Sequence, residues 1–567
     1  MTAIDDLTMQ PRAKDFRPTD EQEQALKFFL TGQSFKINAF AGTGKTTTLE
    51  MLSAADKRKG LYIAFNRSIV DEAKGKFNSK TTCMTTHQLA LKSLPRGLRK
   101  KAFKSTNAAG LVQLLGLKDQ FFGGSLRLTA KTLAFLIIQT IKEFCQGTDE
   151  TITAVDFRRY GKLSGIGESD EAALRNLIGS LADNVWGRMI TPDDMDIFLG
   201  FDGFLKLWAL SKPTLAYDYI LLDEAQDTNP VVLGVLQNQS CQIVYVGDAF
   251  QQIYEWRGAV NAMDEFASAH TSYLTKSFRF GERIAEAASS VLGFLGAKLP
   301  IQGNPKVGSK IGPCDPNAIL ARTNSTVMSE VIAAINAGKK CHILGGTKEL
   351  LKLLNAVNEL KNGRPSEVPE LFGFANWSEV EELVDDGEAD NLMTLVNLVR
   401  THGERHLMWA LRRTEADENS ADVVISTAFK AKGREWDNVR LTNDFLPSLS
   451  EAEGETGIDP GEARVFYVAL TRGRLAVEVD EQLINFFRSK NFAANNEAKQ
   501  PTGRLSPIQT PRQKPNSESA ATPKQARLPL GDLPKEFAKS QKSQKTKKFI
   551  SSSKEKKIND ILAKLGI

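Results

Sequence analysis

The sequence predicts an α/β fold with parallel sheets. Residues 34–77 and 217–292 alternate between short apolar runs, such as LYIAF and YDYILL, and stretches with helical spacing. Uninterrupted apolar runs are typical of strands that are buried on both faces, as in a parallel sheet covered by helices. A glycine-rich segment between the first strand and the helix that follows it supports the same interpretation.

Two α/β domains are predicted, each interrupted by an insertion. The second domain supplies the strands AILARTN, KKCHILGG and ADVVISTAF. The stretch KTLAFLIIQTIKEF has helical periodicity and belongs to a helical insertion in the first domain, whereas the second is interrupted by acidic, helix-prone sequence. The predicted division is 1–87 with 211–271, 88–210 as the first insertion, 272–354 with 421–487, and 355–420 as the second insertion.

The composition predicts an intracellular, water-soluble protein of several domains. A chain of 567 residues is too long for one hydrophobic core. It has no uninterrupted apolar run of about 18 residues, so we expect no membrane span. We find no signal peptide, and the five cysteines include no C-x-x-C pair. We therefore expect a cytoplasmic protein, associated with the nucleoid if the source is a bacterium.

The basic charge of the chain is concentrated in its last segment. From residue 499 onward there are 16 Lys and Arg against 5 Asp and Glu, a net of +11, so the net charge of +5 leaves −6 for residues 1–498. Residues 488–567 are rich in Lys, Ser, Pro and Gln, a composition that predicts a mostly disordered tail. Two interpretations remain open for this tail: contacts with nucleic-acid phosphates, or solubility alone. The final segment has apolar residues at helical spacing and is a candidate for docking on a protein partner.

The glycine-rich segment predicts a phosphate site. Strand, glycine loop and helix follow one another as in a P-loop, although Ala39 stands where the usual pattern begins with glycine. Backbone N–H groups of such a loop surround phosphate oxygens, and the helix N-terminus adds partial positive charge. The lysine is expected at the β and γ phosphates and Thr46 on Mg²⁺. The candidate nucleotide-binding residues are Ala41, Gly42, Thr43, Gly44, Lys45, Thr46 and Thr47.

Adjacent carboxylates end a second apolar strand. In residues 220–227 (ILLDEAQD), the strand delivers Asp223 and Glu224 at its carboxyl end, where ligands bind in open α/β sheets. Asp223 suits Mg²⁺, and Glu224 suits the orientation of an attacking water in phosphoryl transfer. An acidic helix N-terminus is the alternative interpretation of these residues. The loop upstream favours an ATP site with Mg²⁺.

The next motif identifies a family. Residues 246–259 (VGDAFQQIYEWRGA) resemble motif III of UvrD, Rep and PcrA, which are superfamily 1 DNA helicases, and further motifs of this family follow in its order across residues 18–474. The wording around DEAQD is similar to the helicase portion of the F-box DNA helicase. The resemblance implies two RecA-like P-loop domains and an ATP-dependent DNA helicase or translocase that moves 3′-to-5′. It also implies a role in DNA repair, recombination or replication.

The resemblance assigns further residues to ATP. Gln22 matches the glutamine that reads adenine, Phe278 the aromatic residue that stacks on it, and Glu435 a ribose acceptor. Gln251 and Arg279 would contact the γ-phosphate, and the last arginine of the set would act as an arginine finger. The residues assigned to catalysis are Lys45, Asp223, Glu224, Gln251, Arg279 and Arg472.

The resemblance also assigns the DNA contacts. Aromatic side chains stack on successive bases whatever the base sequence, and such stacking suits a motor that steps along one strand. Phe429 stands where the family often has histidine, which removes one polar DNA contact. The residues assigned to DNA are Phe65, Thr86, His87, Tyr254, Trp256, Arg257, Thr427 and Lys432.

Several alternatives remain open on the sequence alone. The protein is expected to act on single-stranded DNA or on junctions of single- and double-stranded DNA, as a monomer. Alternatives are a translocase that strips proteins from DNA and a nucleotide-switched DNA-binding subunit that works with a partner. Residues 355–420 are shorter than the 2B subdomain of UvrD and Rep, so we expect a reduced 2B-like insertion.

Overall fold

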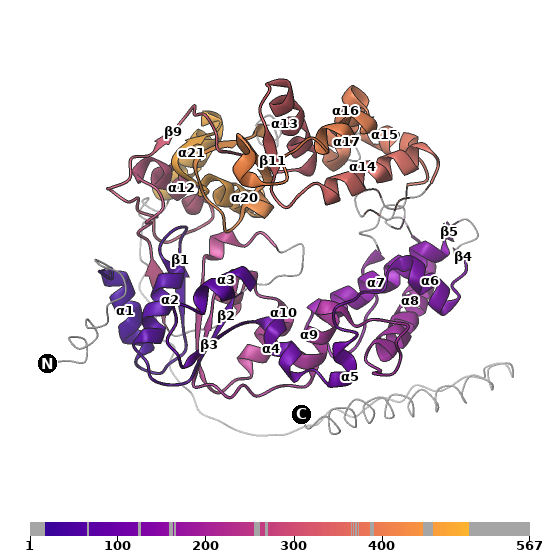
Figure 1. Cartoon of the computed structure of the whole chain (residues 1–567), viewed down its shortest axis with the longest axis horizontal. Helices are drawn as coiled ribbons and strands as arrows, with labels where there is room; N and C mark the ends of the chain where they lie inside the picture. Colours follow the sequence, from indigo (N-terminus) through magenta and orange to yellow (C-terminus); the bar gives the residue numbers. More distant parts are fainter. Residues whose placement is uncertain are drawn as a thin grey trace, which may run out of the picture. The chain divides into compact units, whose positions relative to one another are not determined.

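The computed structural model describes residues 17–497, apart from 65–66, 123–125, 158–162, 164–165, 255–260, 267–269, 365, 367, 369–370, 372–373, 386–389 and 446–457. Two six-stranded sheets form the framework of these residues. Their strands pair in parallel, which confirms the predicted α/β fold. Figure 1 follows the chain from the indigo strands of the first sheet, through purple helices, to the orange elements of the second part. None of the described helices is long and apolar enough to cross a membrane.

The first sheet has the strand order β3-β2-β6-β7-β1-β8. Every residue of its strands β2, β6 and β7 is buried, which explains their apolar sequences. Because β7 pairs with both β6 and β1, the carboxyl ends of these three strands lie at one edge of the sheet. The strands are β1 (Phe35–Ala39), β2 (Gly60–Ala64), β3 (Thr81–Thr85), β6 (Tyr219–Leu222), β7 (Gln242–Gly247) and β8 (Thr271–Leu274). Their helices are α1 (Asp20–Phe29), α2 (Lys45–Ala54), α3 (Arg67–Ala73), α10 (Pro230–Gln237) and α11 (Ala262–Glu265).

The second sheet has the order β11-β12-β10-β13-β14-β9. Strands β10 and β12 are buried along their whole length, as their apolar sequences predict. The strands are β9 (Lys310–Ile311), β10 (Ala318–Ala321), β11 (Cys341–Ile343), β12 (Val423–Thr427), β13 (Trp436–Leu441) and β14 (Gly473–Glu478). The accompanying helices are α12 (Glu282–Phe294), α13 (Asn324–Asn336), α18 (Ala428–Ala431), α20 (Pro460–Leu470) and α21 (Glu481–Glu497). The predicted start of the tail at residue 488 falls inside α21, and residues 498–567 lie outside the described part.

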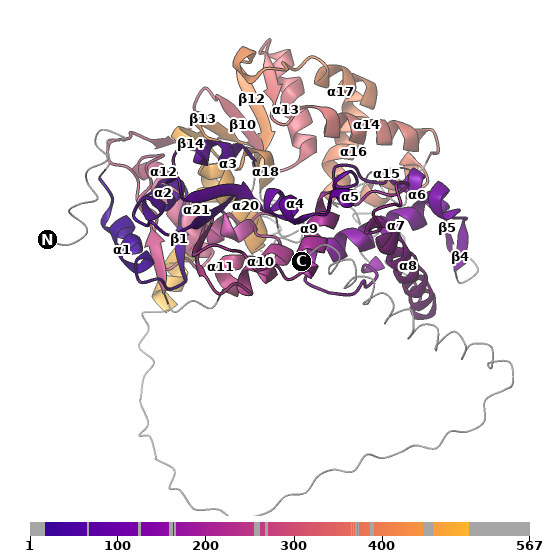
Figure 2. The ribbon, with the colours of Figure 1, turned by 60° about the horizontal axis from the view of Figure 1, so that its bottom comes forward.

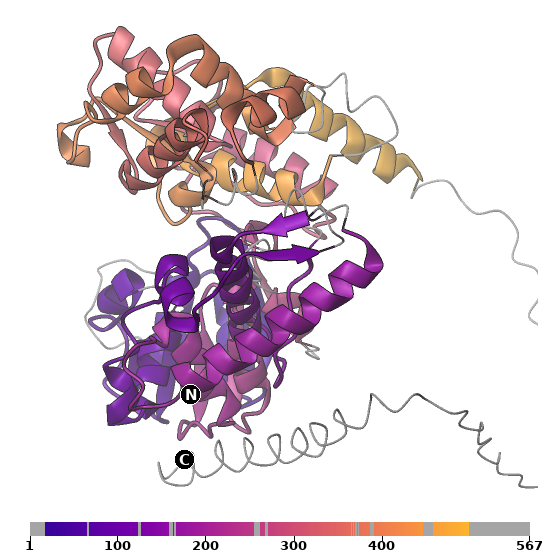
Figure 3. The ribbon, with the colours of Figure 1, turned by 90° about the vertical axis from the view of Figure 1, so that its right-hand side faces the viewer.

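A helical insertion separates β3 from β6. Its helices are α4 (Thr86–Ser93), α5 (Arg96–Arg99), α6 (Ala108–Leu115), α7 (Ala130–Gln146), α8 (Glu168–Met189) and α9 (Gly200–Leu210). A short antiparallel hairpin of β4 (Gln120–Phe122) and β5 (Leu126–Leu128) joins them, and Figure 3 shows its two purple arrows beside the insertion helices. The sequence did not predict this hairpin, because strands this short are too brief to establish an alternating pattern.

Two buried lysines fasten the insertion. Lys206 is 1% exposed, and its Nζ donates to the backbone carbonyls of Gly147 and Asp149, at 2.6 Å each, just beyond the end of α7. The ammonium also lies 4.3 Å from the ring centre of Phe144. Lys101, equally buried, donates to two carbonyls at the end of α8. Each ammonium thus lies at the C-terminal end of a helix, where the helix dipole favours positive charge.

The helices α14 (Lys348–Lys361), α15 (Trp377–Asp385), α16 (Asp390–His402) and α17 (Glu404–Leu411) cover one part of the second sheet. Figure 2 shows α14 and α17 beside α13 and the strands β10 and β12. One hydrophobic core contains side chains from both the helices and the sheet, among them Ile319, Ile425, Leu354, Val396 and Leu407. The stretch predicted as a reduced insertion, residues 355–420, therefore shares its core with the sheet rather than forming a lobe of its own.

We predict that Lys206→Met destabilises the protein by about 1 to 3 kcal/mol, because the substitution removes the ammonium that donates to the carbonyls of Gly147 and Asp149. The measurement is urea denaturation followed by circular dichroism. Lys212→Met is a matched control, since the Lys212 side chain is 71% exposed and its ion pair with Glu150 lies at the surface. Equal unfolding midpoints for the two variants would contradict the fastening role of Lys206.

Candidate active site

A glycine loop joins β1 to α2 and has the backbone geometry of a phosphate site. Gly42 and Gly44 have φ angles of 72° and 77°, a left-handed conformation that favours glycine. A Cβ atom on Gly42 would lie 2.6 Å from Cβ of Arg279, so the loop also needs glycine for this close approach. Helix α2 begins at Lys45, and the backbone N–H groups of its first turn, including those of Thr46 and Thr47, have no acceptor within the helix. The loop, with Ala41 and Thr43 buried beneath it, fits a polyphosphate.

Two carboxylates lie beside this loop, where β6 ends. Tyr62 Oη donates to Asp223 Oδ2 at 2.7 Å, and Gln226 Nε2 donates to Glu224 Oε2 at 2.7 Å. Nζ of Lys45 lies 3.9 Å from Oε1 of Glu224. Glu224 itself has a left-handed backbone, with φ of 51°, which turns the chain sharply after the strand. The sequence prediction that Lys45, Asp223 and Glu224 share one site agrees with this geometry.

The pKa values of the two carboxylates are shifted in opposite directions. Burial and the neighbouring Glu224 raise the pKa of Asp223 above its usual range. Burial also acts to raise the pKa of Glu224, but the nearby Lys45 and Lys432 ammonium groups outweigh it and hold that pKa below its usual range. Glu224 is therefore the group held ionised, whereas Asp223 gains from a cation beside it. This arrangement suits a base at Glu224 and a metal ion at Asp223.

Two arginines complete the site: Arg472 lies between α20 and β14 of the second sheet, whereas Arg279 follows β8 of the first sheet, so the predicted domain boundary at residue 272 falls inside a strand of the first sheet. Arg472 is 2% exposed, and its guanidinium donates to the carbonyl of Val468, while Nη2 lies 3.5 Å from Oε1 of Gln251. Burial, followed by the like charge of Arg279, lowers the pKa of Arg472 to about 9. Arg279 donates from Nε to Glu435 Oε2 at 2.6 Å. The residue predicted to accept from a ribose, Glu435, thus holds an arginine of the same site in this structure.

A tyrosine that the sequence analysis missed joins the two sheets at the loop. Tyr467, on α20, is fully buried and donates from Oη to Asp248 Oδ2 at 3.1 Å. The same oxygen accepts from the backbone N–H of Ala41 at 3.3 Å. Burial raises the pKa of Tyr467 well above its usual range, so the hydroxyl keeps its proton for donation. The position of Tyr467 in the segment FYVALTR was the available signal, five residues before Arg472.

The two residues predicted to contact adenine lie at the other end of the glycine loop. Gln22 is buried; its Nε2 donates to Thr48 Oγ1 at 3.0 Å, and its Oε1 accepts from the backbone N–H of Thr19. Phe278 is 49% exposed, and its backbone N–H donates to the carbonyl of Gly42 at 2.7 Å. A Cβ on Gly44 would lie 3.4 Å from both the Phe278 ring and the Gln22 amide. An exposed ring next to a buried amide fits a stacked base.

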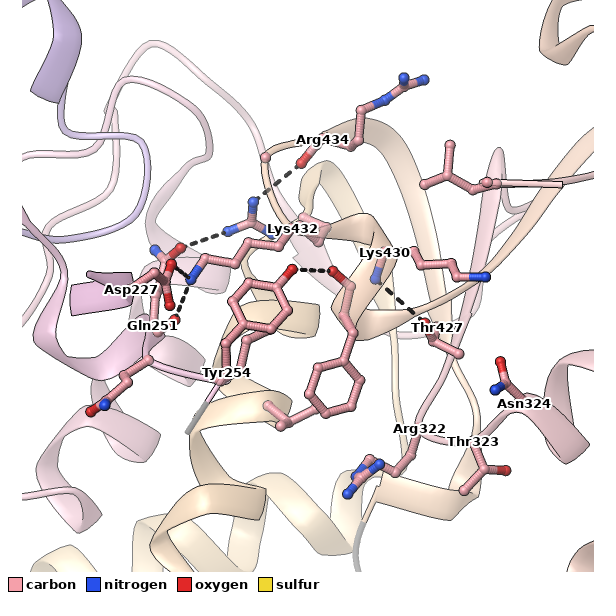
Figure 4. A pocket seen from close by; sticks show the side chains of 18 of the residues that line it. Asp227, Gln251, Tyr254, Arg322, Thr323, Asn324, Thr427, Lys430, Lys432 and Arg434 are labelled. Carbon is pink, nitrogen blue, oxygen red and sulfur yellow. Dashed lines mark hydrogen bonds and ion pairs between the residues drawn. The ribbon is translucent and has the colours of Figure 1, made fainter. Parts of the chain in front are cut away.

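A cavity of about 1250 Å³ extends from the loop to the second sheet. Figure 4 shows side chains from both sheets around it. Arg322, Thr323 and Asn324 are lining residues that the sequence analysis missed. They directly follow the buried strand β10, and polar residues at the carboxyl end of a parallel strand are the signal that could have found them. Thr427, predicted at DNA, lines the same cavity at the end of β12, where it accepts from the backbone N–H of Lys430.

The structure differs from the prediction at Lys432. We expected this lysine at DNA, but its ammonium forms an ion pair with Asp227 and donates to the carbonyl of Gln251 at 2.6 Å (Figure 4). Both side chains of the pair are buried, at 9% and 4% exposure. Beside it, Tyr254 donates from Oη to the carbonyl of Phe429 at 2.9 Å. Lys432 therefore joins the two sheets, because the carboxylate after β6 offers it a buried counter-charge.

A smaller cavity of about 230 Å³ lies beside the same carboxylate loop. Thr86 and His87, predicted at DNA, line it together with Tyr254 and Glu224. Burial lowers the pKa of His87, against the opposing effect of Asp202, so the ring is held neutral. Three further residues predicted at DNA, Phe65, Trp256 and Arg257, lie outside the described residues.

Comparisons with known proteins agree with this geometry. Residues 204–270 match the model of the UvrD/REP helicase N-terminal domain, and residues 337–478 match that of the UvrD-like helicase C-terminal domain. The chain is 30% identical over 508 residues to F-box DNA helicase 1 of Gallus gallus, covering 82% of this chain and 49% of that protein. It is 30% identical over 519 residues to F-box DNA helicase protein 1 of Schizosaccharomyces pombe, covering 83% and 58%.

The chain thus spans about half the length of these F-box relatives. DNA helicase II of Escherichia coli is 34% identical over a shorter segment of 116 residues, which is 17% of this chain and 16% of that protein. The two matched models lie on the two sheets that meet at the glycine loop. Residues 204–270 and 337–478 are therefore similar to the N- and C-terminal domains of UvrD/REP helicases.

Proposed function

We propose that this chain is an ATP-hydrolysing DNA helicase that moves along single-stranded DNA. The observation that carries this proposal is the convergence of Lys45, Glu224, Gln251 and Arg472 from two sheets on one cavity. Phosphoryl transfer requires such positioning of charge, and little covalent chemistry from the protein. The family relationship supports DNA as the nucleic acid and ATP as the nucleotide.

In the proposed site, the glycine loop binds the phosphates of ATP and the base lies between Phe278 and Gln22. Mg²⁺, when bound by Thr46 and Asp223, would neutralise charge that develops on the phosphates. Burial is the main cause of the raised pKa of Asp223, and a bound cation would stabilise the ionised form of this carboxylate. Glu224, held ionised, orients the attacking water and accepts its proton. Arg472 from the second sheet and Arg279 from the segment after β8 stabilise negative charge on the departing phosphate.

We further propose that the Lys432–Asp227 pair couples ATP hydrolysis to movement. Asp227 follows Glu224 by three residues, and Lys432 also donates to the carbonyl of Gln251. A shift of the second sheet would therefore move both the segment after β6, which carries Glu224, and the segment after β7, which carries Gln251. Tyr254 lines the smaller cavity and also bonds to the carbonyl of Phe429. A DNA base that contacts Thr86 and Tyr254 would thus affect the position of the loop after β6, which carries Glu224.

The family resemblance supports 3′-to-5′ movement and a role in DNA repair, recombination or replication, and we propose both. Strand displacement on duplexes with a 3′ or a 5′ single-stranded extension tests the direction. Unwinding from the 3′ extension alone agrees with the proposal. Translocation without strand displacement would instead favour a motor that strips proteins from DNA.

We expect single-stranded DNA to stimulate ATP hydrolysis, and we expect Glu224→Gln to lower kcat by about 10² to 10⁴ because it removes the base. The measurement is steady-state phosphate release with and without DNA, alongside binding of a fluorescent ATP analogue, which the variant should retain. Glu23→Gln, on the exposed face of α1, is the control.

Trp256→Ala should remove the stimulation by DNA. Hydrolysis that is equally fast without DNA and in Trp256→Ala would favour the nucleotide-switch alternative.

The buried pair gives a second prediction. Asp227→Asn and Lys432→Met should each lower the unfolding free energy by about 3 to 5 kcal/mol, since each leaves an uncompensated buried charge. The double variant should recover part of this loss, because neither charge remains. A double-mutant cycle from urea denaturation measures the coupling, and additive effects of the two substitutions would rule out a direct pair.

A further inference from the structure

Helix α17 presents a basic and aromatic face to solvent. Its exposed side chains are Arg405, His406, Trp409, Arg412 and Arg413, including two residues just after the helix. Their spacing places them on one side of the helix. The opposite side, with Leu407, Ala410 and Leu411, is buried in the core that it shares with the second sheet. We call these five exposed residues the α17 face.

The rings of this face are stacked in a row. The His402 and His406 rings have centroids 6.1 Å apart, and the His406 and Trp409 rings are stacked at 5.2 Å with an angle of 20°. The guanidinium of Arg413 lies 4.5 Å from the Trp409 ring centre. Trp409 remains 45% exposed despite these contacts. The stack therefore holds an indole and a guanidinium rigidly at the surface, at little further entropic cost on binding.

The charges of the α17 face are not neutralised. Arg412 and Arg413 form no ion pair with any residue that the structure describes. The contrast is Arg400, on the neighbouring helix α16, which is held by Glu381 and Asp385. Glu404, the acidic residue nearest to the face in sequence, is already paired with Lys361. The α17 face is thus a positive surface on which neither Arg412 nor Arg413 has a carboxylate partner among the described residues.

We propose that the α17 face is a second nucleic-acid contact, separate from the cavity between the sheets. Guanidinium groups form bidentate hydrogen bonds with phosphates, and a nucleic-acid base can stack on an exposed aromatic ring. The α17 face offers both the guanidinium groups and the ring stack, whereas an acidic protein segment would use the guanidinium charges alone. The proposal rests on the proposed function in one respect: the polyanion is the DNA that also enters the cavity. It assigns the face to DNA beyond the strand held in that cavity.

The test compares the full-length protein with Trp409→Ala and Arg413→Glu in fluorescence anisotropy, without nucleotide. Labelled single strands of about 8 and about 30 nucleotides serve as probes, since single-strand sites span about 4 to 16 nucleotides. We expect each variant to weaken binding of the long strand by about tenfold at low salt, as loss of one stacked base or one phosphate contact predicts. Binding of the short strand should be unchanged. The salt dependence should become shallower in Arg413→Glu, but not in Trp409→Ala.

Lys298→Glu is the matched control, because it makes the same charge change at another exposed position. Arg413→Lys should restore most of the binding, which separates charge from misfolding. Weakened binding to the same extent in Lys298→Glu, or unchanged binding of the long strand in both α17 variants, overturns the proposal. DNA-stimulated ATP hydrolysis on the short strand is measured in parallel. Its absence in the unsubstituted protein would contradict the proposed function, while the long-strand binding result would still decide the α17 face.

Discussion

The buried ion pair of Lys432 and Asp227 is the constraint on which the arrangement of the two sheets depends. Two buried charges are stable only when they meet in good geometry, so a shift of one sheet against the other would leave both charges without a partner. The Tyr467 hydroxyl reinforces that position by bonding to both Asp248 and the backbone of Ala41. Glu224, the glycine loop and the two arginines then line one cavity.

Much of the fold could be predicted from sequence because parallel strands that are buried on both faces are written as short apolar runs. Strands β6, β7, β10 and β12 are of this kind, and β6, β7 and β10 are each followed by a polar residue at the ligand edge. The hairpin β4–β5 could not be predicted, since three residues per strand carry no measurable period. The shared core of α14–α17 was also hidden, because apolar spacing shows that a helix has a buried face but not what covers it.

The candidate site shows the same division. Lys45, Asp223 and Glu224 are local motifs, whose chemistry follows from the residues next to them. The partners that depend on long-range folding were harder to find: Lys432 was assigned to DNA because spacing cannot report which carboxylate lies opposite a lysine. Tyr467 and Arg322 were missed for a related reason, since a buried hydroxyl or a guanidinium at a strand end has no meaning until the neighbouring strands are ordered.

The core shared by the second sheet and helices α14–α17 has a consequence for the evolution and engineering of this chain. A graft between relatives that cuts within this segment would divide one hydrophobic core and expose Ile319, Leu354 and Ile425 to water. A graft that moves the segment from β10 to β12 as a unit keeps this core whole, but Ala318, Leu320 and Val424 of the same strands must still match the core on the other face of the sheet. A change of length inside the segment would therefore disturb packing that a substitution on its exposed surface leaves intact.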